Sequence, residues 1–103
     1  MAAYLVVMRD KMIDPAGYAA YGAKVGPTLA GREVRPLVMN GAFKCVEGEP
    51  PHGVVVLEFP TVEAAEAWYF SPEYQAVLGL RLEATEGRAV IVEGVPAPTL
   101  AGR

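Results

Sequence analysis

Two hydrophobic patterns alternate along the chain, and they predict strands separated by helices. Short continuous apolar runs, rich in β-branched residues, occupy residues 4–9, 54–59 and 89–92, and such runs are typical of buried strands. Between them, apolar residues recur every three or four positions, which is the period of a helix packed on one face. The pattern therefore predicts helical regions that begin after Asp14 and after Thr61.

The first helical region has a clear beginning and a disturbed end. Asp14-Pro15 combines an N-cap residue with the proline that is favoured at the first helical position. Because proline lacks an amide proton, Pro27 predicts that the helix ends or bends near Lys24 or Val25. The apolar face of this helix consists of Tyr18, Tyr21, Val25 and Leu29.

The second helical region is divided in two. Thr61 is placed to cap its first segment, and Ser71-Pro72 supplies a new cap and a new first position in mid-pattern. Glu86-Gly87 is expected to end the second segment, since glycine favours the end of a helix. The first segment should bury Val62, Ala65 and Trp68 or Tyr69, and the second Tyr74, Val77, Leu78 and Leu82.

Residues 36–46 form a further β-rich segment that Asn40-Gly41 interrupts. Asn-Gly can form a tight hairpin turn, or Gly41 can mark a bulge in one long bent strand. The two arms, residues 37–39 and 42–46, are short for an independent hairpin, so we favour the bent strand. Residues 47–53 are rich in Gly and Pro and are expected to form a loop.

The resulting order, β-α-β-β-α-β, predicts a ferredoxin-like α+β fold in which two helices cover one face of an antiparallel four-stranded sheet. Residues 1–103 are expected to be a single domain with a tail from about residue 95. The strands do not alternate apolar and polar residues, so both sheet faces should be apolar, yet the helices cover only one. We therefore expect a homodimer packed through the sheet face, which is the dimeric α/β-barrel architecture.

The composition limits the binding partners and the cellular location that we expect for the protein. Hydrophobic residues make up 52% of the chain, which fits a core that a second subunit completes, and the net charge is −3. An acidic chain without a basic stripe is not expected to bind nucleic acid or an anionic membrane. The single cysteine, Cys45, is interpreted as a structural thiol on a strand, and a chain without an intrachain disulfide is expected in the cytoplasm. The apolar N-terminus has no preceding basic region, so we expect no signal peptide.

Several motifs resemble those of one protein family, the domain of unknown function 1330 family. They are Val-Leu-Glu-Phe-Pro at residues 56–60, Ala-Trp-Tyr at 67–69, Ser-Pro-Glu-Tyr-Gln at 71–75, and Arg88 with the segment that follows it. The family commonly has two glycines where this chain has Asn40-Gly41-Ala42. The resemblance implies a ferredoxin-like dimeric α/β-barrel from bacterial cytoplasm. It implies no activity and no catalytic residues.

Few residues have the spacing that known chemistry requires. His52 is the only histidine and lies in a loop without a second ligand at metal-binding spacing, so we expect no metal and no cofactor. Glu58 and Glu93 end apolar strands, where a carboxylate needs a partner, and Arg81 and Arg88 are candidate partners. Arg81 could instead meet the carboxylate of a ligand.

The aromatic residues, in contrast, predict a pocket between sheet and helices. Such a pocket suits a small aromatic or cyclic ligand. The residues expected to bind it are Tyr21, Asn40, Phe43, Trp68, Tyr69, Tyr74 and Arg81. Three hypotheses follow: a homodimer that binds such a ligand, a cofactor-free enzyme of the monooxygenase or isomerase type, and an interaction module whose pocket is filled.

Overall fold

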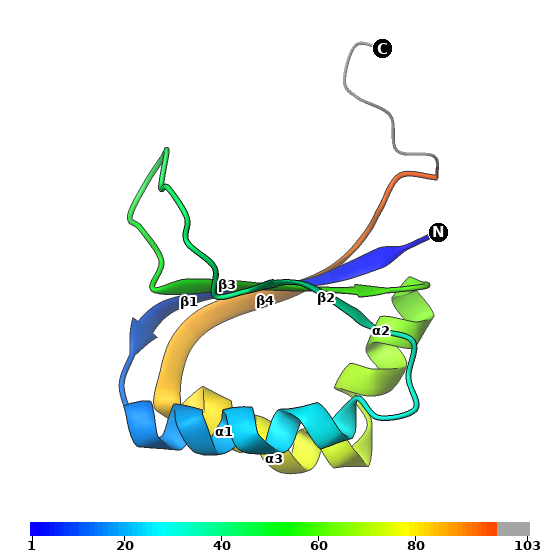
Figure 1. Ribbon diagram of the computed structural model, residues 1–103, viewed down its shortest axis with the longest axis horizontal. Coiled ribbons are helices and arrows are strands. Elements are labelled where there is room, and N and C mark those ends of the chain that lie inside the picture. The colour runs from blue at the N-terminus through cyan, green and yellow to red at the C-terminus, as the bar shows by residue number, and fades with distance from the viewer. Residues whose placement is uncertain (97–103) are drawn as a thin grey trace.

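The secondary structure follows the predicted β-α-β-β-α-β order, with the second helical region split into two helices. The computed structural model describes residues 1–96. Its elements are β1 (Ala3–Met12), α1 (Pro15–Thr28), β2 (Arg35–Met39), β3 (Gly53–Phe59), α2 (Val62–Tyr69), α3 (Pro72–Ala84) and β4 (Thr85–Glu93). The four strands form one antiparallel sheet in the order β2-β3-β1-β4. The helices lie on one side of this sheet (Figure 1), so the predicted ferredoxin-like fold is confirmed.

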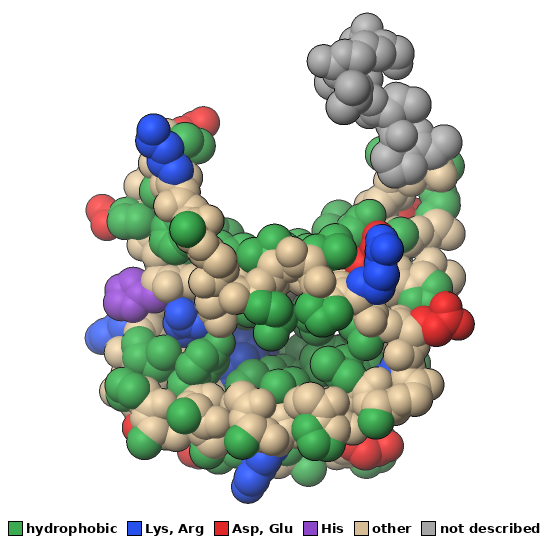
Figure 2. All heavy atoms as spheres, viewed as in Figure 1, with side chains coloured by type: hydrophobic (Ala, Val, Ile, Leu, Met, Phe, Trp, Pro, Cys, Tyr) green, Lys and Arg blue, Asp and Glu red, His purple; other side chains and the backbone are tan. Residues whose placement is uncertain are grey.

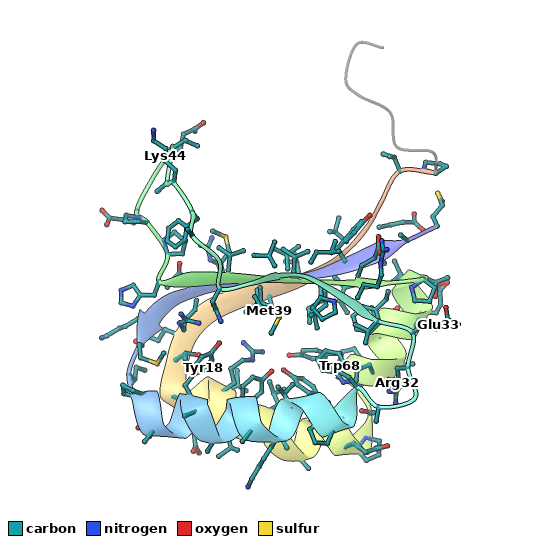
Figure 3. All side chains as sticks on the ribbon, viewed as in Figure 1. Tyr18, Arg32, Glu33, Met39, Lys44 and Trp68 are labelled. Atoms are coloured by element: carbon teal, nitrogen blue, oxygen red, sulfur yellow. The ribbon has the colours of Figure 1, made fainter. Side chains whose placement is uncertain are left out.

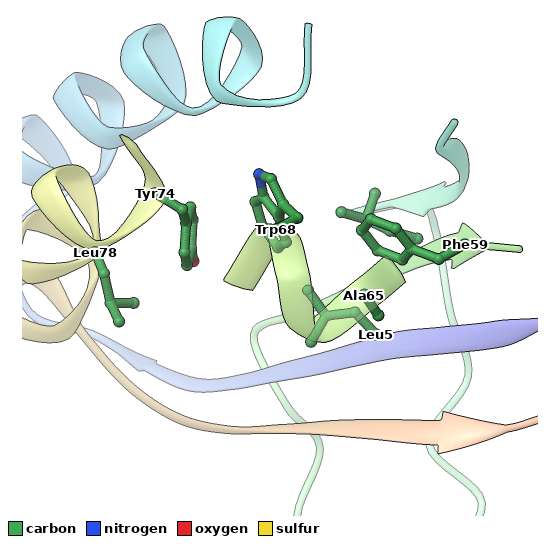
Figure 4. Packing of buried hydrophobic residues seen from close by; sticks show 7 residues of the cluster. Leu5, Phe59, Ala65, Trp68, Tyr74 and Leu78 are labelled. Carbon is green, nitrogen blue, oxygen red and sulfur yellow. The ribbon is translucent and has the colours of Figure 1, made fainter. Parts of the chain in front are cut away.

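The core lies between the inner face of the sheet and helices α2 and α3. Side chains alternate between the two faces of a strand, and the row that faces the helices includes Leu57, Leu5 and Ile91, which lie opposite one another. The buried cluster shown in Figure 4 joins these strands to the helices, and its largest fully buried side chains are Trp68, Tyr74 and Phe59.

Capping explains why α2 and α3 are separate helices. The Thr61 hydroxyl accepts a hydrogen bond from the Ala64 amide at 3.0 Å, as predicted. The buried Ser71 hydroxyl accepts from the Tyr74 amide at 3.2 Å and donates to the Trp68 carbonyl at 2.7 Å. Ser71 therefore begins α3 and also binds the end of α2, which fixes Trp68 and Tyr74 beside each other.

Three details of the helix predictions were wrong. Helix α1 continues through Pro27 to Thr28, because a proline in the last turn removes only one hydrogen bond near an end where amides and carbonyls are already unpaired. The Asp14 side chain makes no capping hydrogen bond. On α3, Leu82 is 59% exposed, whereas Arg81 is buried.

The segment 36–46 is neither a hairpin nor a bent strand. Strand β2 ends at Met39, and Asn40 has a φ of 57°, so the chain turns out of the sheet there. The backbone then forms a loop to residue 52, which projects from the outer side of the sheet (Figure 1). Cys45 accordingly lies exposed in this loop rather than on a strand.

Gly87 does not end a helix, because β4 begins at Thr85 and Gly87 lies within the strand. It pairs with Arg9 next to an irregularity in the register of β1 and β4. A Cβ atom at Gly87 would collide with the Met8 carbonyl oxygen. Glycine is therefore required for close approach of two strands rather than for a helix end.

The outer face of the sheet is apolar and has no covering element among residues 1–96. One row of valines crosses all four strands, because Val38 lies opposite Val56, Val56 opposite Val6, and Val6 opposite Val90. Val90 is 56% exposed. Figures 1 and 2 show this face as the floor of a concavity, with loop 40–52 at one end and residues 94–96 at the other.

The buried position of Trp68 predicts a large loss of stability on truncation. Trp68→Ala should lower the free energy of unfolding by about 3–5 kcal/mol, because it removes a fully buried indole. Denaturant unfolding measures this loss. Phe70→Ala is the control, since Phe70 is 66% exposed two residues away, and it should cost about 0.5 kcal/mol or less. Equal losses in the two variants would contradict the packing described.

Candidate ligand cavity

A cavity lies between α1 and the sheet because α1 packs against α3 instead of against the strands. Its volume is about 250 Å³. The inner-facing side chains of β1, β2 and β3 form one wall, α1 forms the opposite wall, and Trp68, Tyr74 and Arg81 contribute from α2 and α3. In Figure 2 it is visible as a hollow below the sheet, and in Figure 3 the side chains of Tyr18, Met39 and Trp68 point toward this space.

Three polar contacts hold α1 across the cavity. The Arg9 guanidinium of β1 donates to the Tyr18 hydroxyl at 3.0 Å. The hydroxyls of Tyr21 and Tyr74 lie 2.8 Å apart and share a hydrogen bond. The indole Nε1 of Trp68 donates to the Thr28 hydroxyl at 3.0 Å. These contacts tie the helix to its neighbours at its start, middle and end without filling the space beneath it.

Aromatic rings close the inner end of the cavity. Trp68 and Tyr74 are in contact, with ring centroids 4.1 Å apart, and Tyr74 meets the edge of Tyr21 at 6.3 Å. Burial, and then the hydrogen bond to Tyr74, raise the pKa of the Tyr21 hydroxyl far above its usual value. Tyr21 therefore stays neutral and can donate or accept a hydrogen bond, but it does not act as a base at neutral pH.

Arg81 brings the only cation from the helices to the cavity wall. It is 8% exposed, and its Nε has no hydrogen-bond partner. Burial lowers the pKa of Arg81, but the charge interaction and side-chain hydrogen bond with Tyr74, and then the interaction with Tyr21, more than offset this, so the pKa is raised and the guanidinium stays charged. No carboxylate lies within ion-pair distance of it among the described residues.

A second arginine organises the end of the cavity near loop 40–52. Besides Tyr18, Arg9 contacts the Asn40 side-chain oxygen at 3.0 Å and the His52 carbonyl at 3.1 Å. Its guanidinium also lies 4.8 Å from the centroid of the Tyr18 ring. Arg9 thus holds both ends of the loop near α1. It could have been assigned to the inner face from sequence, because it shares the alternation of Leu5 and Val7.

The cavity brings together most of the residues that were predicted to bind a ligand. Those that line it are Tyr21, Asn40, Trp68, Tyr74 and Arg81. Phe43 does not, because it lies 48% exposed in loop 40–52. Tyr69 faces a separate hollow between α2 and β4. Met39 and Gly22 also line the cavity, although no pattern in the sequence indicated either residue.

The carboxylates that were candidate partners of Arg81 lie elsewhere. Glu58 forms an ion pair with Arg35 at 2.6 Å. Arg88 pairs with Asp10 rather than with Glu93. His52 is exposed, as expected for a loop residue, and the described residues contain no group of three or more candidate metal ligands. Among them, no helix has both the length and the apolar character needed to cross a membrane.

Comparison with solved structures places the fold among small proteins mostly without assigned activity. A protein of unknown function from Rhodopseudomonas palustris is 21% identical, with a TM-score of 0.71 over 93% of this chain and 84% of that one. A dimeric ferredoxin-like protein of unknown function from Jannaschia sp. is 20% identical, with a TM-score of 0.65 over 91% of this chain and 100% of that one.

A further structural neighbour has a stated activity. SnoaB, a cofactor-independent oxygenase from Streptomyces nogalater, is 10% identical, with a TM-score of 0.62 over 99% of this chain and 98% of that one. At such identities the likeness shows the fold alone. No curated protein matches the chain significantly. A family model does match it, over residues 2–95, so this chain belongs to the DUF1330 family, a domain of unknown function.

Proposed function

We propose that this protein is a homodimer, each subunit of which binds a small aromatic or cyclic molecule in the cavity between sheet and helices. The observation that carries the proposal is the open cavity itself, with walls of aliphatic and aromatic side chains and a few polar groups. This composition is usual for small-molecule sites. The third hypothesis, an interaction module with a filled pocket, is disfavoured because the protein's own side chains leave the space open.

The size of the cavity limits the ligand. An engineered apolar cavity of about 150 Å³ binds benzene, and ordinary ligand sites begin at about 300 Å³. The present cavity, at about 250 Å³, lies between these values. It therefore suits a molecule with a single ring and one or two small substituents.

The wall residues favour binding over acid–base catalysis. None of the side chains assigned to the cavity wall is Asp, Glu or His, and Tyr21 is kept protonated by its burial. A cofactor-free enzyme remains the second candidate, because Arg81, Asn40 and the Tyr21–Tyr74 pair all reach the same cavity. Chromatography of a compound incubated with the protein separates the two candidates, because only an enzyme would consume the compound over time.

Two glycines of α1 provide a matched test of the cavity. A Cβ atom at Gly22 or at Gly26 would meet nothing within 4 Å, but only Gly22 lines the cavity. Gly22→Leu should fill the space and abolish binding of neutral one-ring probes such as phenol and benzamide. Gly26→Leu should bind them like the unchanged protein. Each variant should gain about 0.5–1 kcal/mol of stability, since glycine is unfavourable within a helix.

The fluorescence of Trp68 measures this binding, because Trp68 is the single tryptophan and lies in the cavity wall. Titration should change its emission in the unchanged protein and in Gly26→Leu, but not in Gly22→Leu. Equal binding by both glycine variants would place the ligand outside the cavity.

The outer face of the sheet supports the homodimer. The valine row spans the full width of the sheet, and monomeric proteins rarely leave so continuous an apolar face in water. Three of the structural neighbours with unknown function, among them the one from Jannaschia sp., are described as dimeric and ferredoxin-like. We infer that a second copy packs on this face, related by two-fold symmetry. The exposed, unpaired Cys45 supports a cytoplasmic location.

A charge placed in the valine row should separate the subunits. Val90→Glu would bury a carboxylate in an apolar interface, so the dimer should dissociate at micromolar concentration. Leu82→Glu, at a position 59% exposed on α3, is the control and should stay dimeric. Native mass spectrometry and sedimentation velocity measure both. A monomeric unchanged protein, or a dimeric Val90→Glu, would count against the sheet-to-sheet contact.

A further inference from the structure

Arg81 is a buried charge without a counter-charge. Its side chain comes from α3 and reaches the cavity wall, and the residue is 8% exposed. Its Nε has no hydrogen-bond partner, and no ion pair reaches its guanidinium among residues 1–96. The nearby Tyr74 hydroxyl is a neutral partner, so the carboxylate of a ligand would supply a counter-charge that the described residues do not provide.

Residues 1–96 do not supply the missing negative charge elsewhere in the cavity. Glu58, which the sequence suggested as a partner of Arg81, lies on the outer side of the sheet and pairs with Arg35. Arg9, whose Nε is also buried without a partner, lies with Arg81 in the wall of a small adjoining hollow. Its terminal nitrogens contact only neutral oxygens, those of Tyr18, Asn40 and His52. Two guanidinium groups thus lie beside one small region, and no carboxylate among the described residues lines its wall.

A neutral donor lies beside them. In the Tyr21–Tyr74 pair one hydroxyl donates to the other, which leaves the second proton without a partner among the described residues. That proton is available to an oxygen of a ligand. The cation and the neutral hydroxyl donor can both bind a carboxylate, and the apolar wall beside them can hold a ring. Together they suit an acid attached to a ring.

We propose that the ligand is a monocarboxylate with one ring, whose carboxylate binds Arg81 and whose ring lies against Tyr21 and Trp68. This inference rests on the proposed function, since it assumes that the cavity is occupied. Guanidinium groups bind carboxylates with two parallel hydrogen bonds, which fixes the orientation of the acid as well as its charge. The volume of about 250 Å³ suits a single ring that carries its acid group.

Matched acid and amide probes test the charge without changing the ring. Isothermal titration would compare benzoate with benzamide, and cyclohexanecarboxylate with cyclohexanecarboxamide, at neutral pH. In the unchanged protein each acid should bind at least about tenfold more tightly than its amide, as expected for a charge-assisted hydrogen bond. Arg81→Met should abolish this preference and leave amide binding within about threefold of the unchanged protein.

Arg32→Met is the control, because it removes the same charge from a residue that does not line the cavity. It should keep the full preference for the acid. The ligand-free Arg81→Met protein should melt at about the same temperature as the unchanged protein, since the lost contact with Tyr74 is offset by the removal of a buried charge. If Arg81→Met does not fold, Arg81→Lys serves instead, and it should weaken acid binding while leaving amide binding unchanged.

The outcomes separate the two proposals. Equal binding of acid and amide would overturn the monocarboxylate assignment and leave ligand binding in the cavity intact. An acid preference that survives in Arg81→Met would overturn the role of Arg81. Failure of all four probes to bind would overturn both the assignment and the proposed function. A markedly lowered melting temperature in Arg81→Met, together with an acid preference that Arg81→Lys leaves unchanged, would make Arg81 a structural residue, contrary to the inference.

Discussion

The rest of the site depends on the separation of α1 from the sheet. In a fully packed sheet–helix layer, apolar side chains from both elements would interdigitate. Here the Trp68 indole donates to Thr28, and the Tyr74 hydroxyl meets that of Tyr21, so the helix is held at the far side of two large rings. Because polar contacts fix the helix at a distance, the space beneath it stays open, and Arg81 faces it without a carboxylate partner among the described residues.

Two surfaces, the outer valine row and the cavity, therefore lack a packing partner among the described residues, and each suits a different kind of partner. The outer valine row is broad and exposed, which is the form of surface that a second copy covers. The cavity is small, aromatic and positively charged, which suits a single small anion. A composition with 52% hydrophobic residues is understandable once both surfaces are counted.

Local signals in the sequence predicted the fold well because each has a direct physical cause. Ser71-Pro72 begins a helix through its hydroxyl and its fixed backbone, and the structure has that helix. Continuous apolar strands predicted two apolar sheet faces. Features that depend on tertiary packing could not be predicted from these local signals. Leu82 fits the helical period of a buried stripe, but the position beside it, Arg81, is the one that packing turns inward.

The candidate site was predicted in part for the same reason. Trp68, Tyr74 and Tyr21 converge because helical spacing and the cap at Ser71 place them. Phe43 was misplaced because the turn at Asn40 takes the chain out of the sheet, and a sequence cannot say whether Asn-Gly closes a hairpin or ends a strand. Whether Arg81 pairs with a carboxylate of the chain depended on distances between separate strands, which only the fold determines.

Nuclear magnetic resonance of the arginine Nε–H groups tests the central claim most directly, because Arg81 Nε is the buried atom left without a partner. The Arg81 signal would be assigned by its absence from Arg81→Met. Addition of benzoate should move this signal strongly downfield while the signals of exposed arginines such as Arg35 stay in place. A benzoate titration that leaves the Arg81 signal unmoved, or that moves only the exposed arginines, would contradict the account.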